Sequence, residues 1–299
     1  MFRYNNYERL LMTVSLKQIT PLRYPGGKAK LGPWLSELIH FNGINGGYYI
    51  EPYAGGAGAA FYLLMSGAVK KIIINDLDPA IYYFWWAVLN DTEWFLKKIN
   101  NTSVCMEEWR QQKEVIKNMD RYSRSEIGFA TFFLNRTNMS GILKAGVIGG
   151  KNQNGNYKMN VRFNKETLIE RIKYIKLHKT CIELYNLDAI EFIDKVVTKL
   201  PEKKLVYFDP PYYLKGSQLY RNHYRHNDHL IISKSIKKLK CPWLITYDNC
   251  NEIKSLYSDV NIIEFSLRYS THRSRLLSTE IMFYKNLQLH EEPQLLKQF

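Results

Sequence analysis

The sequence predicts an α/β protein built on one doubly wound, mostly parallel sheet with an antiparallel closing strand and a basic, mainly helical insert. Short apolar runs alternate with helical patterns over residues 15–90 and again after 180. This order is typical of parallel strands joined by helical crossovers. Residues 91–180 break the alternation and hold 17 Lys and Arg against 9 Asp and Glu.

The first part of the sheet begins with two apolar runs that end in acid. "YYIEPYAGG" (48–56) predicts a strand, and "AGAAFYLLMSG" (57–67) predicts a helix that its final glycine ends. "KKIIIND" (70–76) predicts a second strand. "PAIYYFWWAVLN" (79–90) predicts a helix that opens on proline, which is tolerated in a first turn.

The basic insert follows. Residues 107–119 and 125–136 have helical patterns. In the polar run "GGKNQNGNYKMNVRF" (149–163), the dipeptide Asn154-Gly155 predicts a β-hairpin between short strands.

The alternation of strand and helix returns after the insert. Strands are predicted at 181–186, 205–208 and 243–248, helices at 188–197, 229–239 and 251–257, and a closing hairpin from 261–265 and 280–286. The predicted organisation is a discontinuous catalytic domain (15–90 and 181–286), an insert (91–180) and peripheral tails (1–14 and 287–299).

The composition limits the classes of partner. The 299 residues carry a formal charge of +14 with a pI near 9.4, which favours a polyanion such as nucleic acid. A basic protein with no nucleic-acid role is the alternative. We find no 18-residue apolar run, no signal peptide and no basic amphipathic helix, so no membrane partner is expected.

The four cysteines do not have the spacing of a zinc or redox motif. Cys105, Cys181, Cys241 and Cys250 are expected to be reduced in a cytoplasmic protein, and no metal site is predicted.

The run "LVYFDPPYY" (205–213) places an acid at the end of a predicted buried strand. Two prolines must end the strand, because they lack an N–H group and have a fixed φ. Asp209 therefore lies at the carboxyl end of a strand, where ligands bind in open α/β sheets. A strand end with a polar cap is the alternative.

Two glycine loops precede predicted helices. "EPYAGGAGAA" (51–60) could bind a dinucleotide, a carboxylate or nothing, and it lacks the third glycine of a dinucleotide fingerprint. Asp76 lies 18 residues after Gly58 and could accept hydrogen bonds from a ribose, or could cap the next helix, a role that Asp78 fits better. "RYPGGKAKL" (23–31) is either an anion loop or a turn before a helix at 31–40.

Four motifs in order resemble the Dam-type DNA adenine-N6 methyltransferases: "RYPGGK" (23–28), "EPYAGGAG" (51–58), "IIIND" (72–76) and "DPPY" (209–212). "FFLNRTNMSG" (132–141) is also similar to the family pattern. The resemblance covers roughly residues 17–285 and implies a Rossmann-like methyltransferase sheet. The glycine loop has one residue more than the family's shorter form, so the role of Gly55 is open.

The resemblance implies S-adenosylmethionine as cofactor. The glycine loop would hold its amino-acid end, Asp76 its ribose and Asp188 its adenine, although Asp188 could simply cap a helix. The implied cofactor-binding residues are Tyr24, Lys28, Glu51, Tyr53, Gly56, Gly58, Asp76, Asp188 and Asp209.

The resemblance also implies the chemistry of the D-P-P-Y run. The carboxylate of Asp209 and the main-chain carbonyl of Pro210 would each accept one N6–H bond from adenine and direct the nitrogen lone pair at the methyl group. Pro211 would rigidify the turn. Tyr212 would stack on a base flipped out of the duplex, with Tyr213 as a second wall. Direct in-line transfer needs no metal and no covalent enzyme intermediate.

The insert is the expected target-recognition region, in which basic side chains position phosphates and polar ones read base edges. Each candidate could instead be a solvated loop residue. The candidates in the insert are Arg136, Asn138, Lys151, Asn152, Gln153, Asn154, Lys158 and Arg162, of which Arg136 and Asn138 could instead orient the hairpin or contact the DNA backbone. A second basic run, "RYSTHRSR" (268–275) between the last two predicted strands, adds Arg273 and Arg275 as candidate phosphate contacts.

The function predicted is site-specific methylation of adenine N6 in double-stranded DNA by a monomer, with a restriction endonuclease as a candidate partner. The alternatives are methylation of cytosine N4, of RNA or of protein, and a non-catalytic DNA-binding protein of the same fold.

Overall fold

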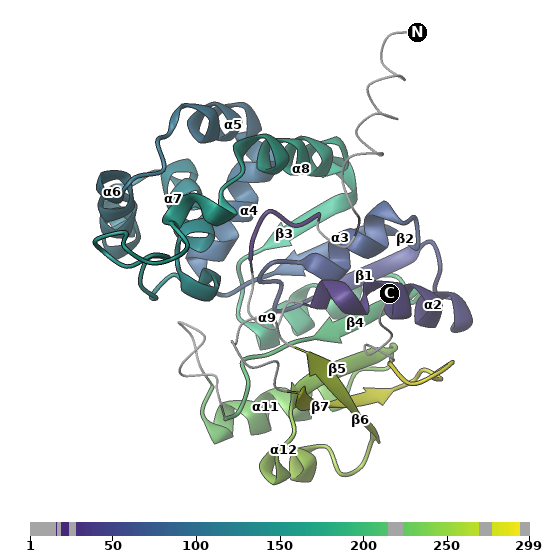
Figure 1. Ribbon diagram of the computed structural model, residues 1–299. Helices are drawn as coiled ribbons and strands as arrows, with labels where there is room; N and C mark the ends of the chain where they lie inside the picture. Colours follow the sequence, from purple (N-terminus) through teal and green to yellow (C-terminus); the bar gives the residue numbers. More distant parts are fainter. Residues whose placement is uncertain (1–15, 17–18, 24–27, 215–223, 269–276, 294–299) are drawn as a thin grey trace, which may run out of the picture. The chain divides into compact units, whose positions relative to one another are not determined.

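The computed structural model describes residue 16 and residues 19–23, 28–214, 224–268 and 277–293 (Figure 1). The chain forms two compact units. The sheet unit consists of Lys28–Asp78 and Cys181–Phe299, and the helical unit of Met1–Gly27 and Pro79–Thr180.

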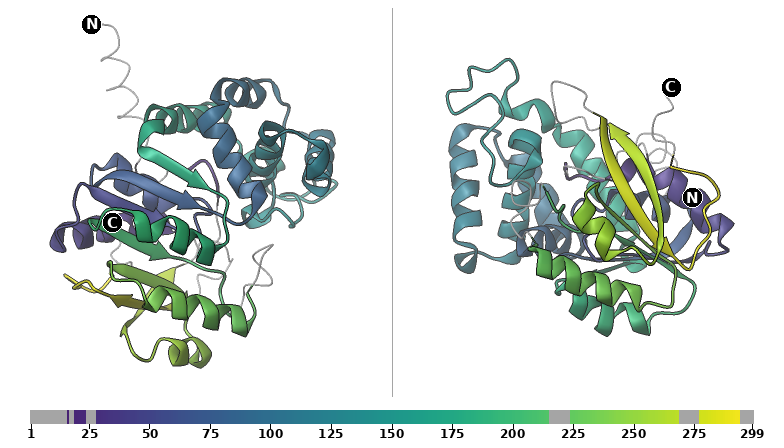
Figure 2. Two further views of the ribbon diagram at one scale, coloured as in Figure 1. Left: turned by 180° about the vertical axis from the view of Figure 1, so that it is seen from behind. Right: turned by 90° about the horizontal axis from the view of Figure 1, so that it is seen from below.

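The sheet unit contains seven strands in the order β3-β2-β1-β4-β5-β7-β6. The first five pair in parallel, and β7 is antiparallel to both of its neighbours. Figure 2 shows β6 and β7 as the long closing hairpin. The strands are β1 (Gly47–Glu51), β2 (Val69–Asn75), β3 (Ile182–Tyr185), β4 (Lys204–Phe208), β5 (Trp243–Asp248), β6 (Asn261–Arg268) and β7 (Leu277–Lys285).

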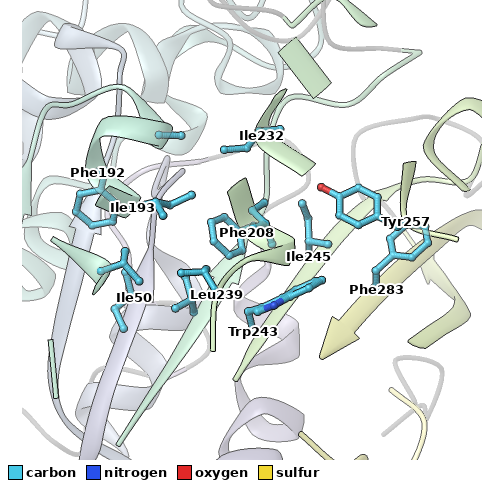
Figure 3. Close-up of a cluster of buried hydrophobic side chains, with 14 of the residues drawn as sticks. Ile50, Phe192, Ile193, Phe208, Ile232, Leu239, Trp243, Ile245, Tyr257 and Phe283 are labelled. Carbon is cyan, nitrogen blue, oxygen red and sulfur yellow. The ribbon is translucent and has the colours of Figure 1, made fainter. Parts of the chain in front are cut away.

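The central strands are apolar because helices cover both faces of the sheet. Every residue of β4 and of β5 is buried, which is typical of parallel strands inside an α/β protein. On one face, Figure 3 shows side chains of β1, β4 and β5 packed with those of α9 (Ala189–Lys195) and α11 (His226–Lys237). The short helix α12 (Asn251–Leu256) joins the same cluster.

The other face carries α3 (Gly58–Met65). Ile50 of β1 points into the cluster of Figure 3, so its neighbour Glu51 points to the opposite face. There, Glu51 Oε1 accepts a hydrogen bond from the backbone N–H of Ala60 in α3. The 3₁₀ helix η2 (Lys28–Leu31) and α2 (Gly32–Phe41) precede β1. The doubly wound, mostly parallel sheet predicted from the sequence is confirmed, as are its strands.

The helical unit packs around α7 (Arg124–Thr137). Its aromatic core includes Phe84 and Phe132, whose rings stack with 6.1 Å between centroids. Gly128 allows α4 to approach, because a Cβ there would lie 2.5 Å from the carbonyl oxygen of Tyr83. The other helices are α4 (Pro79–Asn90), α5 (Thr92–Asn101), α6 (Met106–Lys117) and α8 (Lys165–Leu177).

The compact units divide at residue 78 rather than at residue 90, where the sequence placed the start of the insert, and again at residue 180. The reason is α4, whose apolar side chains pack on α7 within the helical unit. The functional boundaries of the insert stay a prediction.

The predicted β-hairpin at 149–163 is wrong. Over these residues the structure has turns and the 3₁₀ helix η5 (Met159–Arg162), with no strand. The side chain of Gln153 explains the difference. Its amide donates to the carbonyls of Ile148 and Gly150 and accepts from Met159 N–H, so it satisfies main-chain groups that a ladder would use.

Residues 287–293, part of the expected C-terminal tail, lie on α2. The backbone of Gln288 exchanges hydrogen bonds with the Asn42 side chain, and Trp34 donates to the carbonyl of Glu291. None of the described helices has the length and apolar character needed to cross a membrane.

Candidate active site

The candidate active site lies at the carboxyl edge of the sheet, between two adjacent strands. β1 ends at Glu51, and β4 is followed directly by Asp209. From β1 the chain order runs through β2 and β3 in one direction, while β4 and β5 lie on the other side. This reversal is the switch point at which open α/β sheets bind ligands.

The Asp209 carboxylate is held by one of its oxygens. Oδ1 accepts hydrogen bonds from Lys28 Nζ at 2.9 Å and from Thr246 Oγ1 at 3.0 Å. Thr246 is itself bonded to the Tyr207 hydroxyl at 2.9 Å. The Asp209 side chain is 22% exposed, and both of these donors contact Oδ1. Among the described residues, Oδ2 therefore has no hydrogen-bond donor of its own.

Lys28, the first residue of η2, links that helix to the Asp209 carboxylate. Its side chain is 4% exposed and its ammonium lies 2.9 Å from the Tyr212 hydroxyl and 3.7 Å from Glu280 Oε2. Burial alone would lower the pKa of Lys28, but the charges of Asp209 and Glu280 outweigh burial and raise it well above the ordinary value. Lys28 is thus a buried cation beside Asp209, and its place near the cofactor stays a prediction.

The turn after β4 is anchored by a residue that the sequence analysis missed. Asp248, the last residue of β5, accepts hydrogen bonds from the backbone N–H groups of Tyr213 and Leu214, both at 2.8 Å. Pro210 and Pro211 are buried in the same turn. The signal available was weak, because an acid at the end of a strand also fits an ordinary cap.

Tyr212 is more enclosed than a base-stacking residue at a surface would be. It is 7% exposed, and its hydroxyl accepts from Lys28 and donates to Glu280 Oε1. Glu280 lies in the middle of β7 and is 1% exposed. Burial raises the pKa of Glu280 to about 7. The sequence analysis used Glu280 only as part of the closing strand.

The second glycine loop is shaped by left-handed backbone. Gly55 and Ala57 have φ of 46° and 47°, which glycine adopts most easily. A Cβ on Gly58 would lie 2.8 Å from that of Ala29, so the loop passes close to η2. Gly56, which the prediction favoured over Gly55, is buried in the loop.

Asp76 supports this loop from the end of β2. Its Oδ2 accepts from Gly55 N–H at 2.8 Å and its Oδ1 from Asp78 N–H at 2.9 Å. Burial raises the pKa of Asp76 to about 7, and the charge of Asp78 adds to the rise. Asn75, which was not singled out, donates to the carbonyls of Pro52 and Leu187 and so ties the loops after β1 and β3 together.

The other two predicted cofactor residues of the sheet unit have partners of their own. Asp188 caps α9 by accepting from Ile190 N–H at 2.9 Å, the alternative that the sequence left open. The Tyr53 hydroxyl is 2.9 Å from that of Tyr224. Tyr24 lies outside the described residues.

Two of the predicted DNA-binding residues have structural contacts in the helical unit. Asn138 is fully buried and accepts from Trp109 Nε1 at 2.7 Å. Arg136 donates to the carbonyls of Arg162 and Pro21, and burial together with neighbouring arginines lowers its pKa to about 9. Both side chains are held by contacts within their own unit, and a role for either in DNA binding stays a prediction.

The remaining DNA-binding candidates differ in exposure. The Gln153 amide is engaged by its own loop, as described above. Arg273 and Arg275 lie outside the described residues. The exposed candidates are Lys151, Asn152, Asn154, Lys158 and Arg162.

The charge of the site suits a cationic ligand. Burial raises the pKa of Glu51 to about 8, and Asp209 adds to the rise. Glu51, Asp209 and Glu280 all interact with the single ammonium of Lys28. Buried carboxyls that exceed the cations around them are stabilised by an added positive charge. The residues therefore fit a cofactor that carries a sulfonium and an amino group.

A seven-stranded α/β sheet with D-P-P-Y at its switch point is the architecture of an amino methyltransferase. A model of the D12 class N6 adenine-specific DNA methyltransferases matches residues 24–271. The chain belongs to this family, and its activity is the methylation of adenine in DNA.

Two curated relatives are type II methyltransferases. M.MjaIII of Methanocaldococcus jannaschii is 26% identical over 204 residues, which cover 64% of this chain and 68% of that protein. M1.LlaDCHI of Lactococcus lactis subsp. cremoris is 26% identical over 211 residues, which cover 67% of this chain and 66% of that protein. A solved structure from Pyrococcus horikoshii, named as an RNA methyltransferase, has a TM-score of 0.41 at 12% identity and covers 95% of this chain and 98% of that one.

Proposed function

We propose that the protein transfers a methyl group from S-adenosylmethionine to N6 of an adenine flipped out of double-stranded DNA, with Asp209 and Pro210 as the acceptors of the amine hydrogens. The observation that carries the proposal is the arrangement of Asp209. Both described donors that hold the carboxylate contact Oδ1, and the half-buried side chain keeps Oδ2 for a further donor.

The exocyclic amine of adenine is a poor nucleophile, because its lone pair is delocalised into the ring. One N6–H bond to Asp209 Oδ2 and one to the Pro210 carbonyl favour a pyramidal nitrogen with a directed lone pair. Holding the amine at attack distance could supply several kcal/mol, within the roughly 7–11 kcal/mol ascribed to orientation. The buried prolines fix the carbonyl, and Asp248 fixes the turn that follows it.

Tyr212 contributes the face of its ring. Stacking on a base is worth about 1–3 kcal/mol. The hydroxyl is bonded to Lys28 and Glu280, so the orientation of the ring is set before a base arrives. A fixed ring lowers the entropy lost when the base is bound.

S-adenosylmethionine supplies an electrophilic methyl group when bound. Glu51, Tyr53, Gly56 and Gly58 are proposed to hold its amino-acid end, Asp76 its ribose and Asp188 its adenine. Asp76 also holds the Gly55 backbone, so it couples the shape of the loop to the ribose site. Tyr24, Lys28 and Asp209 complete the proposed set.

The exposed residues of the recognition segment, Lys151, Asn152, Asn154, Lys158 and Arg162, are proposed to contact DNA. Lysine and arginine would neutralise phosphates, and the asparagines would read base edges. Pairing with a restriction endonuclease, action as a monomer and a cytoplasmic location are further parts of the proposal. The type II names of the relatives support the first of these.

The test compares the wild type with Asp209→Ala and Asp209→Asn. Each protein is incubated with unmethylated DNA and S-adenosylmethionine, and the DNA is digested to nucleosides for mass spectrometry. We expect N6-methyldeoxyadenosine from the wild type and a loss of about 100-fold or more in both variants. Asp259→Ala, at an exposed surface ion pair, is the matched control and should keep wild-type turnover.

Wild-type turnover in Asp209→Ala would refute the catalytic assignment. N4-methyldeoxycytidine would keep the mechanism and change the base. Cofactor binding by calorimetry without a methylated nucleoside would point to RNA or protein, and no cofactor binding would favour a non-catalytic protein.

A further inference from the structure

Glu280 is a buried acid for which the proposed methyl transfer has no direct use. It lies in β7, pairs in register with Asp248 of β5 and with Phe265 of β6, and is 1% exposed. A buried carboxyl is costly unless it is paired and hydrogen-bonded. Glu280 therefore needs hydrogen-bond and charge partners to be stable inside the closing strand.

The partners of Glu280 are Tyr212, in the turn after β4, and Lys28, in η2. Oε1 accepts a hydrogen bond from the Tyr212 hydroxyl, which itself accepts from Lys28 Nζ at 2.9 Å. Oε2 accepts no hydrogen bond from any residue that the structure describes and lies 3.7 Å from Lys28 Nζ. Lys28 also donates to Asp209 Oδ1 at 2.9 Å.

One ammonium is thus shared by two carboxyls. When Glu280 holds a proton, the charge of Lys28 is directed at Asp209 and weakens that carboxylate as an acceptor. When Glu280 is ionised, it attracts Lys28 through Oε2 and leaves more of the negative charge of Asp209 for a substrate donor. At these separations and in a buried site, such charge effects are large.

We propose that Glu280 is a positioning residue that sets, through Lys28 and Tyr212, how strongly Asp209 accepts a hydrogen bond from the target amine. The proposal rests on the proposed function, since it concerns the same methyl transfer. In this proposal Glu280 acts through its two partners, Lys28 and Tyr212.

The proposal implies a pH dependence near neutrality. Burial raises the pKa of Glu280 to about 7; Lys28 opposes the rise and Asp209 adds to it. As the pH rises through 7, Glu280 loses its proton, and transfer should become faster. The charged or titratable groups that face this network are Glu51 from β1, Lys28 from η2, Tyr207 from β4, Asp209 and Tyr212 from the turn, and Asp248 from β5.

The test measures the methylation rate between pH 6 and 8 under single-turnover conditions, so that product release does not contribute to the rate. The wild type should rise about tenfold with an inflection near pH 7, the change expected when only the ionised form is active. Glu280→Gln keeps an oxygen to accept from Tyr212 but cannot ionise, so its rate should be flat over the window. Glu280→Asp should restore an inflection, and Glu264→Gln, on the exposed part of β6, should keep the wild-type profile.

Tyr212→Phe provides a second measurement if Glu280→Gln does not fold. The hydroxyl of Tyr212 lowers the pKa of Glu280, so its removal should move the inflection to higher pH whatever it does to the maximal rate. The proposal would be overturned if Glu280→Gln or Tyr212→Phe kept the wild-type inflection. It would also be overturned if the wild type methylated adenine at a rate that does not depend on pH. A wild type that yields no methylated adenine at any pH would instead be a failure of the proposed function.

Discussion

At the scale of single residues, the number of hydrogen-bond donors around a carboxyl group affects whether its ionised form is favoured. Asp209 has two donors on one oxygen, while the buried Glu51 accepts from the backbone of Ala60 at 3.2 Å. Donors stabilise the ionised form, and burial without enough of them favours the protonated form. Burial therefore favours the protonated form of Glu51, whose pKa it raises to about 8.

Glu51 makes stability depend on pH in a predictable direction. Its pKa is raised by burial from 4.5 to about 8, so the folded state binds more protons than the unfolded state between these values. The free energy of unfolding should therefore fall as the pH rises across this window, by at most about 1.4 kcal/mol per pH unit for this group. Urea unfolding at pH 5.5 and 7.5 should show a smaller loss in Glu51→Gln than in the wild type.

Glu252→Gln, at an exposed position of α12, is the control and should lose as much as the wild type. An equal loss in Glu51→Gln would mean that Glu51 is ionised in the folded protein throughout this range.

Sequence reasoning could find Asp209, Lys28 and Asp76 because each stands in a short motif with a distinctive pattern. It could not find Glu280, which lies in an apolar strand pattern 71 residues after Asp209. The signal available was the acid itself, since a charged residue inside a buried strand needs a partner.

At the scale of elements, the strands and helices around the site could be predicted because apolar periodicity survives in a buried sheet. The prediction at 79–90 matches α4 residue for residue. The hairpin prediction at 149–163 failed, because Asn-Gly describes the local preference for a turn and says nothing of a side chain that competes for the backbone. Gln153 is that side chain.

The turn after β4 should depend on Asp248. Asp248→Ala leaves the N–H groups of Tyr213 and Leu214 without their acceptor, which costs about 1–3 kcal/mol for a buried donor. We expect a lower melting temperature and a lower single-turnover rate, with cofactor binding by calorimetry largely retained. Asp248→Asn keeps one acceptor oxygen, so its melting temperature and its rate should lie between those of the wild type and of Asp248→Ala. A wild-type rate in Asp248→Ala would show that the turn holds its shape without this anchor.

At the scale of the whole molecule, the charge of +14 predicts affinity for DNA that falls with salt. The insert 91–180 supplies +8 of this charge, and Lys151 is one of its exposed cations. Lys151→Gln should weaken binding equally on all sequences and reduce the slope of log K against log salt by about 1.

Lys199→Gln is the control for this experiment, because Lys199 is exposed just before β4 and so at the amino edge of the sheet. A slope that Lys151→Gln leaves unchanged would remove Lys151 from the phosphate contacts.

The sequence by itself determined the order of the motifs, the parallel strands and the sheet edge at which Asp209 and the glycine loop after β1 lie, because each depends on residues close together in the chain. The tertiary structure alone decided that both described donors to Asp209 contact the same oxygen, and that Lys28 and Glu280 face the same turn. Lys28 and Asp209 are 181 residues apart, and Glu280 reaches them because β7 is inserted between β5 and β6. Contacts of that kind follow from strand order and register, which no local pattern encodes.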